Sequence, residues 1–291
     1  MKAMTKLIPI ICLFVIIGGS LFYSCSQEKK KETAIVLPLE AALSQAGENR
    51  VELEKVLHRY QSNPSDSLKY RAACFLIENM PSYTYYKGKL LEQYLTFFTL
   101  LQEARSKKIY PQTMVDSIRK MYGPFSLDSL QYCKDVVTVD SAYLCNNIDW
   151  AFKVWQEQPW GKSVSFADFC EYILPYRIGD ETLSYWREDI YRKYNPLLDS
   201  LRASTVLDIE DPLVAARCLC DSLRKRSRFF TTTVPQGLPH VGPEIAQSVS
   251  GSCRELSDYV VYVCRALGIL VHNRHGKRHG RKNATVKKPS E

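Results

Sequence analysis

The sequence predicts a mostly α-helical protein that is exported behind an apolar leader. Three observations support this prediction: an apolar stretch near the start, apolar residues at helical spacing between about residues 44 and 228, and prolines at helix-length intervals through that region. Of the 291 residues, 45% are hydrophobic and 24% are charged, as in ordinary globular proteins. Wholesale disorder, collagen-like structure and a polytopic membrane protein are therefore excluded.

Residues 1–24 predict the signal peptide of a bacterial lipoprotein. Two lysines precede an apolar stretch over residues 7–22, which is shorter than the roughly 20 residues that a spanning helix needs. Ser24 and Cys25 follow this stretch, and a small residue before a cysteine resembles the bacterial lipobox, whose cysteine is diacylated and becomes the new first residue. Because Phe22 and Tyr23 are bulkier than that pattern expects, an uncleaved anchor and an ordinary signal peptide stay open as alternatives.

If Cys25 carries palmitate-like acyl chains, its partner is a lipid membrane. We therefore predict a location in the bacterial cell envelope, at the outer membrane or cell surface. At about 0.8 kcal/mol per buried CH₂, such chains hold a folded body at a membrane without a spanning helix. Residues 25–43, which begin polar and Lys-rich, predict a tether between the anchor and that body.

The net charge of +8 does not predict a nucleic-acid partner. The excess comes from Lys2, Lys6 and residues 272–291, where seven Lys or Arg stand beside one Glu, so the body between the two ends is neutral. A neutral body lacks the basic patch that a nucleic-acid groove requires.

Export changes the interpretation of the ten cysteines. Apart from Cys12 in the leader and Cys25, they stand in a compartment that permits disulfides. No CxxC pair is present, and we predict no metal site and no cofactor. Cys218 and Cys220 are two residues apart on a predicted helix and cannot bridge each other there. Buried free thiols are the alternative to disulfides among Cys74, Cys133, Cys145, Cys170, Cys218 and Cys220.

Residues 44–206 are predicted as a helical region. Ser165 and Asp168 have capping-box spacing, with Asp168 in the place usually held by Glu or Gln, and Pro175 ends the segment that they open. Apolar stripes at helical spacing are formed by Leu53, Val56, Leu57 and Tyr60, by Leu144, Ile148, Ala151, Phe152 and Trp155, and by Phe166, Phe169, Cys170 and Ile173.

Aromatic clusters in this region allow two interpretations. Tyr83, Tyr85 and Tyr86 follow Pro81 and could stack on a sugar ring. We favour the other interpretation, in which they seal the core, because a tyrosine at a helix end buries its ring and keeps its hydroxyl wet.

Residues 251–269 predict an amphipathic helix with a cysteine at its start. Leu256 belongs to an apolar face, Asp258 and Arg265 are placed on the opposite side, and Gly268 is the expected C′ stop. Cys253 then lies at the first turn, where helix amides favour a thiolate, so it is the candidate nucleophile. Cys264 lies three turns further along and is predicted to be a core thiol.

This stretch resembles the catalytic helix of the transglutaminase-like superfamily. The resemblance is carried by Gly251, Cys253, Glu255, Ser257 and the residues from Arg265 to Ile269. It implies that residues 207–271 are part of an α+β, papain-like cysteine domain, so the full fold-class prediction is a mostly α amino-terminal region followed by an incomplete domain of this kind. Intact relatives would act on a peptide or protein amide: a thiolate attacks the carbonyl, a thioester forms, and water or an amine releases it.

The chain departs from the family pattern after Ile269. Such a mechanism needs a histidine, and the family places it on strands that follow the cysteine helix, but residues 272–291 show no apolar alternation and predict a basic disordered tail. Gln247 is the candidate oxyanion donor, and His240 is a second candidate for that role or for local polarity. Of the histidines in the tail, His272 follows the first short strand instead of standing on the next one, so the family's histidine does not transfer to it. A metal site of His272, His275 and His279 would need a helix, which Gly276 and Gly280 oppose.

We therefore expect an exported, lipid-anchored protein with a partial transglutaminase-like domain, truncated or frame-shifted and nearly inactive. Losing one member of a nucleophile–base pair costs about 10⁴-fold or more in rate. Two alternatives stay open: a non-catalytic binding protein of the cell surface, and an active enzyme with a base from the tail.

Overall fold

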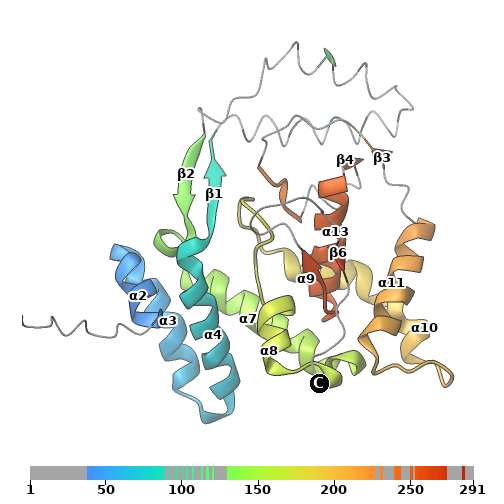
Figure 1. Cartoon of the computed structure of the whole chain (residues 1–291), viewed down its shortest axis with the longest axis horizontal. Helices are drawn as coiled ribbons and strands as arrows, with labels where there is room; N and C mark the ends of the chain where they lie inside the picture. The colour runs from blue at the N-terminus through green and yellow to red at the C-terminus, as the bar shows by residue number, and fades with distance from the viewer. Residues whose placement is uncertain are drawn as a thin grey trace, which may run out of the picture. The chain divides into compact units, whose positions relative to one another are not determined.

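Helices dominate the part of the chain that the structure describes (Figure 1). The structure is a computed structural model, and it describes residues 38–88, 130–226, 230–231, 239–243, 250–251, 253–273 and 284–285, together with nine single positions between 91 and 120. The prediction of a mostly α-helical fold is confirmed. Within these residues no helix is both long and apolar enough to cross a membrane.

The first group of elements packs around the long helix α7, Ser141–Glu157. It contains the helices α2, Pro38–Gln45, α3, Arg50–Gln61, and α4, Ser67–Asn79, and the short helices η1, Gly47–Asn49, η2, Pro64–Asp66, η3, Met80–Ser82, and η5, Asp135–Val137. Strands β1, Thr84–Lys87, and β2, Gln131–Lys134, pair antiparallel, with Thr84 opposite Lys134.

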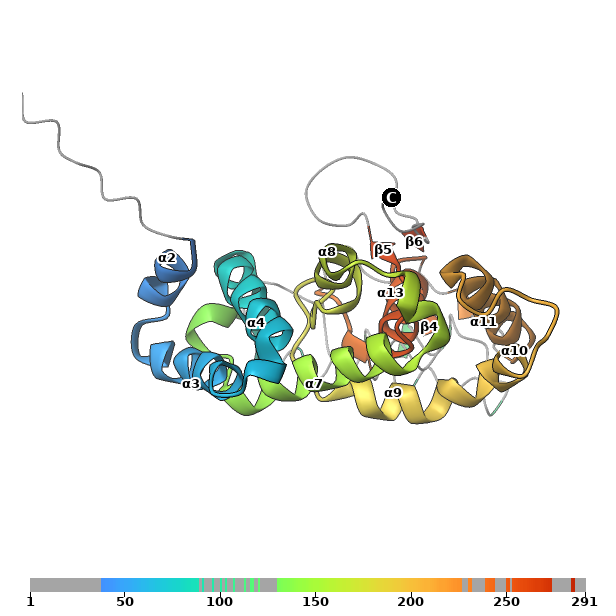
Figure 2. The same ribbon diagram turned by 90° about the horizontal axis from the view of Figure 1, so that it is seen from below.

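The second group packs around α13, Cys253–Ala266. It contains η6, Pro159–Ser163, α9, Trp186–Tyr194, η8, Asn195–Leu198, α10, Asp199–Arg202, and α11, Pro212–Arg226. Helix α8, Phe166–Asp168, and the π-helix η7, Phe169–Ile173, lie between η6 and α9 in the chain and pack in the first core. Strand β3, Phe230–Thr231, pairs parallel with β4, Ser250–Gly251, and β5, His272–Asn273, pairs antiparallel with β6, Ala284–Thr285. Figures 1 and 2 show α2, α3 and α4 at one end of these helices, α10 and α11 at the other, and α7, α9 and α13 between them.

The first core confirms the predicted apolar stripes. Asp140 caps α7 by accepting a hydrogen bond from the Tyr143 amide, and Ser165 caps α8 by accepting one from the Asp168 amide, as its capping-box spacing predicts. The stripe residues buried in this core are Leu53, Val56, Leu57, Tyr60, Leu144, Ile148, Ala151, Phe152, Phe169, Cys170 and Ile173.

Helix α2 begins at Pro38, inside the stretch 25–43 that the sequence assigns to a tether. The difference has a packing cause, because Ala42 and Leu43 are buried and Leu39 packs against the first core. Burial of these apolar side chains stabilises the helix, even though the residues before it are polar and Lys-rich.

The second core crosses the boundary that the sequence places at residues 206 and 207. Trp186, Ile190 and Leu198 from the predicted helical region are buried together with Leu219 of α11 and Tyr262 of α13. The described residues from Pro38 onward belong to one compact unit. The structure therefore has no domain boundary at residue 207, because α9 and η8 supply part of the core around α13.

The segment after α13 is buried, although the sequence that follows it shows no apolar alternation to supply further strands. Ile269, Leu270 and Val271 are each at most 1% exposed. Gly268 ends the helix as predicted: its φ is +69°, its amide donates to the Arg265 carbonyl, and the Ile269 amide donates to the Cys264 carbonyl, which is a Schellman motif. The chain thus turns sharply back into both cores.

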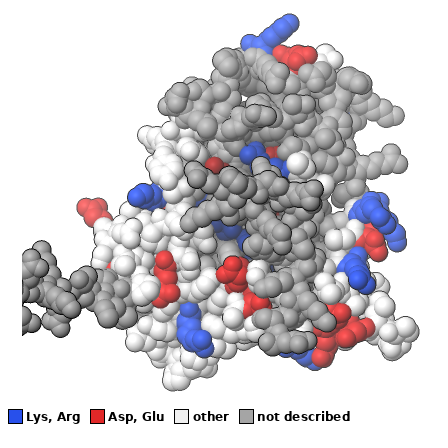
Figure 3. Space-filling model, viewed as in Figure 1, with Lys and Arg blue, Asp and Glu red and all other residues white. Residues whose placement is uncertain are grey.

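Part of the predicted basic tail is paired. His272 and Asn273 form β5, opposite Thr285 and Ala284 of β6, and the rest of residues 272–291 lies outside the described residues. On the face that Figure 3 shows, described Lys and Arg are interspersed with described Asp and Glu, in agreement with a neutral body.

Two buried arginines hold the end of η7 against α9 and α13. The Arg187 guanidinium donates to the carbonyls of Ile173, Leu174 and Pro175, and that of Arg265 donates to the carbonyls of Pro175 and Arg177. These groups satisfy carbonyls that a helix end leaves without intrahelical partners. Burial, together with the neighbouring charge of Arg265, lowers the pKa of Arg187 to about 9, which still leaves it cationic at neutral pH.

Replacing Gly268 should cost far more stability than replacing another glycine with positive φ. An added Cβ at Gly268 would lie 2.8 Å from the Val154 carbonyl oxygen, whereas at Gly47, with a φ of +57°, it would meet no atom within 4 Å. We expect Gly268→Ala to lower the free energy of unfolding by about 2–4 kcal/mol and Gly47→Ala by about 1 kcal/mol. Urea unfolding followed by circular dichroism measures both, and equal losses would contradict the close approach of α13 to α7.

Candidate functional site

Cys253 lies where the sequence places it, as the first residue of α13, and its side chain is exposed. Strand β4 ends two residues before it, so the chain passes from a short parallel strand pair directly into the helix. Ser257 stabilises this first turn because its hydroxyl donates to the Cys253 carbonyl at 2.8 Å. The thiol is therefore accessible beside the amides of a helix of 14 residues.

The polar side that the sequence assigns to α13 is not a solvent-facing side. Asp258 is 1% exposed and Arg265 is 7% exposed, whereas Leu256 and Val260 are only partly buried. The prediction was wrong because it assumed that charged residues face water. Here each buried charge has a hydrogen-bonding partner, which is the condition under which burial is tolerated.

His240, which precedes α13 in the chain, and Asp258 of α13 form a largely buried pair. His240 Nδ1 lies 2.7 Å from Asp258 Oδ2, and their side chains are 15% and 2% exposed. The backbone on both sides of the imidazole is held as well: the His240 amide donates to Asp180 Oδ1 at 2.7 Å, and the Arg254 guanidinium donates to the Pro239 carbonyl at 3.3 Å. The Pro239–His240 segment is thereby fixed along the first turns of α13.

The His240 ring packs directly against a glycine. A Cβ at Gly179 would lie 2.2 Å from the ring Cδ2, so only glycine leaves room for the imidazole there. Burial by itself would lower the pKa of His240, but the hydrogen bond to Asp258 and the negative charges of Asp258, Glu181 and Asp180 raise it.

Glu181 is the buried centre of the loop that faces this pair. The amides of Ile178 and Gly179 each donate to its carboxylate at 2.7 Å, and the Tyr262 hydroxyl donates to it at 2.8 Å. Burial acts to raise the pKa of Glu181, but the charges of Arg177 and His240 and the amide hydrogen bonds lower it. Glu181 is therefore held as a carboxylate inside the protein.

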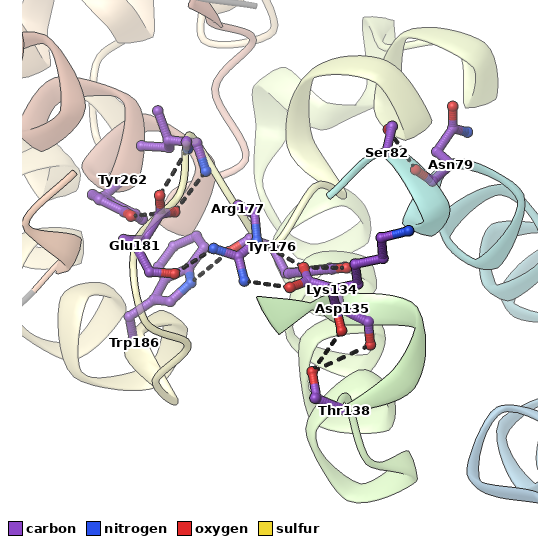
Figure 4. A network of polar contacts seen from close by, with 12 residues as sticks. Asn79, Ser82, Lys134, Asp135, Thr138, Tyr176, Arg177, Glu181, Trp186 and Tyr262 are labelled. Carbon is purple, nitrogen blue, oxygen red and sulfur yellow. Dashed lines mark hydrogen bonds and ion pairs between the residues drawn. The ribbon is translucent and has the colours of Figure 1, made fainter. Parts of the chain in front are cut away.

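Arg177 joins this loop to the first core, as Figure 4 shows. Its guanidinium makes a bidentate pair with Asp135, at 2.7 Å on each side, and also donates to the Glu181 carbonyl. The Tyr176 hydroxyl donates to the same Asp135 carboxylate at 3.0 Å. The side chains of Arg177 and Asp135 are 1% and 0% exposed, so this ion pair is fully buried.

The pair and the thiol leave α13 in different directions. Asp258 is five residues after Cys253, which corresponds to about 7.5 Å of rise and about 140° of rotation on a helix. Both residues are described, and no hydrogen bond joins the Cys253 thiol to the His240 imidazole between them. His240 and Asp258 are therefore arranged like the base and the acid of a catalytic triad. The third bond of such a triad, from the nucleophile Cys253 to the base, is missing between these described residues.

The remaining predicted residues fall into two groups. Gln247, the oxyanion candidate, and Cys25, the lipid-attachment candidate, lie outside the described residues. Cys264 is 1% exposed, which confirms a core thiol. Each of the eight described cysteines is a free thiol, and no cluster of metal-ligating side chains occurs among the residues described.

Sequence analysis missed the partners of His240. His240 itself was considered only as a weak polar candidate, and Asp180, Glu181 and Asp258 were not considered as a group. Asp258 is 18 residues from His240 and Glu181 is 81 residues from Tyr262, so no local spacing marks these contacts. The only local signal is Gly179, followed by two acidic residues, which is typical of a tight turn around a carboxylate.

Comparison with known proteins gives no relative: no family model, curated protein or solved structure matches this chain.

The His240–Asp258 pair predicts a specific dependence of stability on pH. Because the pKa of His240 is raised in the folded state, its stabilisation is complete below its unfolded value of about 6.5 and is lost as pH rises through the folded value. We expect the difference in unfolding free energy between the wild type and His240→Asn to shrink from pH 6 to pH 9, by about 1.4 kcal/mol for each unit of raised pKa. Urea titrations at each pH measure this difference.

Asp258→Asn serves as the matched variant, because it removes the same contact from the other side. It should lose the same pH-dependent part as His240→Asn. A difference between wild type and His240→Asn that stays constant from pH 6 to pH 9 would show that the imidazole gains nothing from Asp258.

Proposed function

We propose that this chain is a lipid-anchored protein of the bacterial cell envelope that carries the cysteine helix of a transglutaminase-like domain and uses Cys253 as its reactive group. The observation that supports the proposal is the exposed thiol on the first residue of α13. Helix amides without intrahelical partners lie at that point, and reactive cysteines are found at such helix starts. The membrane anchor rests on Cys25 and the segment before it.

The chemistry proposed for the intact class is acyl transfer. A Cys253 thiolate attacks an amide carbonyl carbon, the carbon–sulfur bond forms, and the carbon–nitrogen bond breaks as the amine leaves with a proton. Water or a second amine then releases the acyl group from the thioester. Both proton transfers need a base within hydrogen-bonding distance of the sulfur.

Turnover by this chain is proposed to be low. His240 has an orienting acid, Asp258, on its Nδ1, but no hydrogen bond between the described residues joins its ring to the Cys253 sulfur. Without a base at the sulfur, the rate falls by about 10⁴-fold or more relative to a complete nucleophile–base pair. We therefore expect the Cys253 thiol to react with alkylating agents but the protein to turn over an amide substrate hardly at all.

Alkylation by iodoacetamide tests this proposal on the protein as it stands. Cys253 should be labelled at pH 7 about tenfold faster than free cysteine, as reactive cysteines at helix starts are. Peptide mapping by mass spectrometry assigns the rate to each cysteine. Cys220, which is also exposed but lies within α11, supplies the internal comparison. It should react more slowly than free cysteine, since partial desolvation of its sulfur and the negative charge of Asp221 raise the pKa of its thiol.

Two variants complete the test. Cys253→Ser should remove the fast phase, and Cys220→Ser should leave it unchanged. Labelling of Cys253 at the rate of free cysteine or below would refute an activated thiol and would favour the alternative, a non-catalytic binding protein of the cell surface.

A further inference from the structure

A small pocket lies apart from Cys253, between the first strand and the start of α7. It has a volume of about 230 Å³ and is lined by residues of three segments, which include Tyr85 of β1, Asp140 and Tyr143 at the start of α7, and Ser184 and Tyr185 just before α9. Pockets that hold drug-sized molecules measure about 300–1,000 Å³, so this one has room for a single ring-sized group.

The aromatic part of the lining is rigidly held. The Tyr143 ring makes edge-to-face contacts with Tyr185, at 5.4 Å between centroids, and with Tyr176, at 5.8 Å. Tyr143 is 7% exposed, but Tyr185 is 54% exposed, so about half of this residue is open to solvent. A large aromatic side chain that is fixed by packing and still exposed is typical of a binding surface rather than of a core.

The polar part of the lining is incompletely paired. Ser184 Oγ is buried and has no hydrogen-bond partner among the described residues. Asp140 uses Oδ1 to cap α7 at 2.7 Å from the Tyr143 amide, and no hydrogen bond to a described residue occupies its Oδ2. Because Ser184 Oγ is buried, it is out of reach of a ligand, whereas Asp140 Oδ2 is an acceptor on an exposed residue.

The pocket is pre-formed because its loop is tied to β1. The Tyr86 amide donates to the Asp180 carbonyl at 3.4 Å, and the Thr182 hydroxyl donates to the Tyr86 carbonyl at 3.4 Å. Burial and the negative charge of Asp140 raise the pKa of Tyr185, so its hydroxyl stays protonated as a donor. A pocket that needs no rearrangement loses less affinity to ordering on binding.

From this lining we infer a site for a neutral, hydroxyl-rich ring, that is, for one sugar residue of a glycan. The C–H face of a sugar packs on an exposed aromatic ring such as Tyr185, and its hydroxyls can donate to Asp140 Oδ2. Asp140 is the only charged residue of the lining, so an anionic sugar is disfavoured by repulsion. A proline ring of a peptide fits the volume, but it has no hydroxyl to donate to Asp140 Oδ2.

This site is independent of the chemistry proposed for Cys253. None of its lining residues belongs to α13 or to the Pro239–His240 segment, so loss of glycan binding and loss of thiol reactivity are separate results. Of the tyrosines that follow Pro81, only Tyr85 lines this pocket, beside Tyr143 and Tyr185. The inference therefore supports the sugar-stacking interpretation for Tyr85 and not for Tyr83 or Tyr86.

Isothermal titration calorimetry tests the inference on the full chain, kept in a detergent without a sugar headgroup. The probes are three neutral disaccharides: cellobiose, maltose and N,N′-diacetylchitobiose. We expect at least one to bind with a Kd of about 0.1–5 mM, as suits a pocket for one ring. Tyr185→Ala and Asp140→Asn, in which the amide oxygen can still cap α7, should each weaken that binding by about threefold to tenfold.

Tyr132→Ala is the matched control, because Tyr132 lies on β2, is 58% exposed and does not line the pocket. Its affinity should equal that of the wild type. The inference is overturned by no binding of any of the three disaccharides at about 20 mM, by unchanged affinity in both pocket variants, or by tighter binding of glucuronate or a proline-rich peptide than of the neutral sugars.

Discussion

The structure depends on a guanidinium that is buried between two acidic residues of different segments. Arg177 pairs with Asp135, which precedes α7, and donates to the backbone of Glu181, whose side chain receives the Tyr262 hydroxyl from α13. One arginine thereby connects the first core to the second. A charge in this position is costly to bury unless every partner is in place, so the pair fixes the geometry of both sides together.

The candidate site inherits its geometry from this connection. The loop from Ile178 to Glu181 can approach α13 because Arg177 holds its start, and the same loop supplies Asp180 to the His240 backbone and Gly179 to the His240 ring. The thiol at Cys253 is outside this network, on another face of α13. Reactivity of the sulfur and stability of the buried charges are thus separate properties of a single helix.

Much of the helical architecture was predictable from local pattern. The stripe around Leu53, the cap at Ser165, the start of α13 at Cys253 and its stop at Gly268 all follow from spacing within a few residues. The buried charges were not predictable, since Asp258 and Arg265 look like a solvent face until partners far along the chain are known. The burial of residues 269–271 was not predictable for the same reason: Leu270 joins the first core and Ile269 and Val271 join the second, both built from residues far along the chain.

The most direct test of this account is a urea titration of Arg177→Met, a variant that removes the connecting charge. Unfolding is monitored by one signal from each core. We expect a loss of about 3–5 kcal/mol, because Asp135 stays buried without its partner, whereas Arg192→Met, at an exposed pair with Glu188, should cost less than about 0.5 kcal/mol. We also expect the signals from α4 and α13 to separate into two transitions in Arg177→Met. A loss below about 1 kcal/mol with a single unchanged transition would contradict the claim that this buried pair joins the two cores.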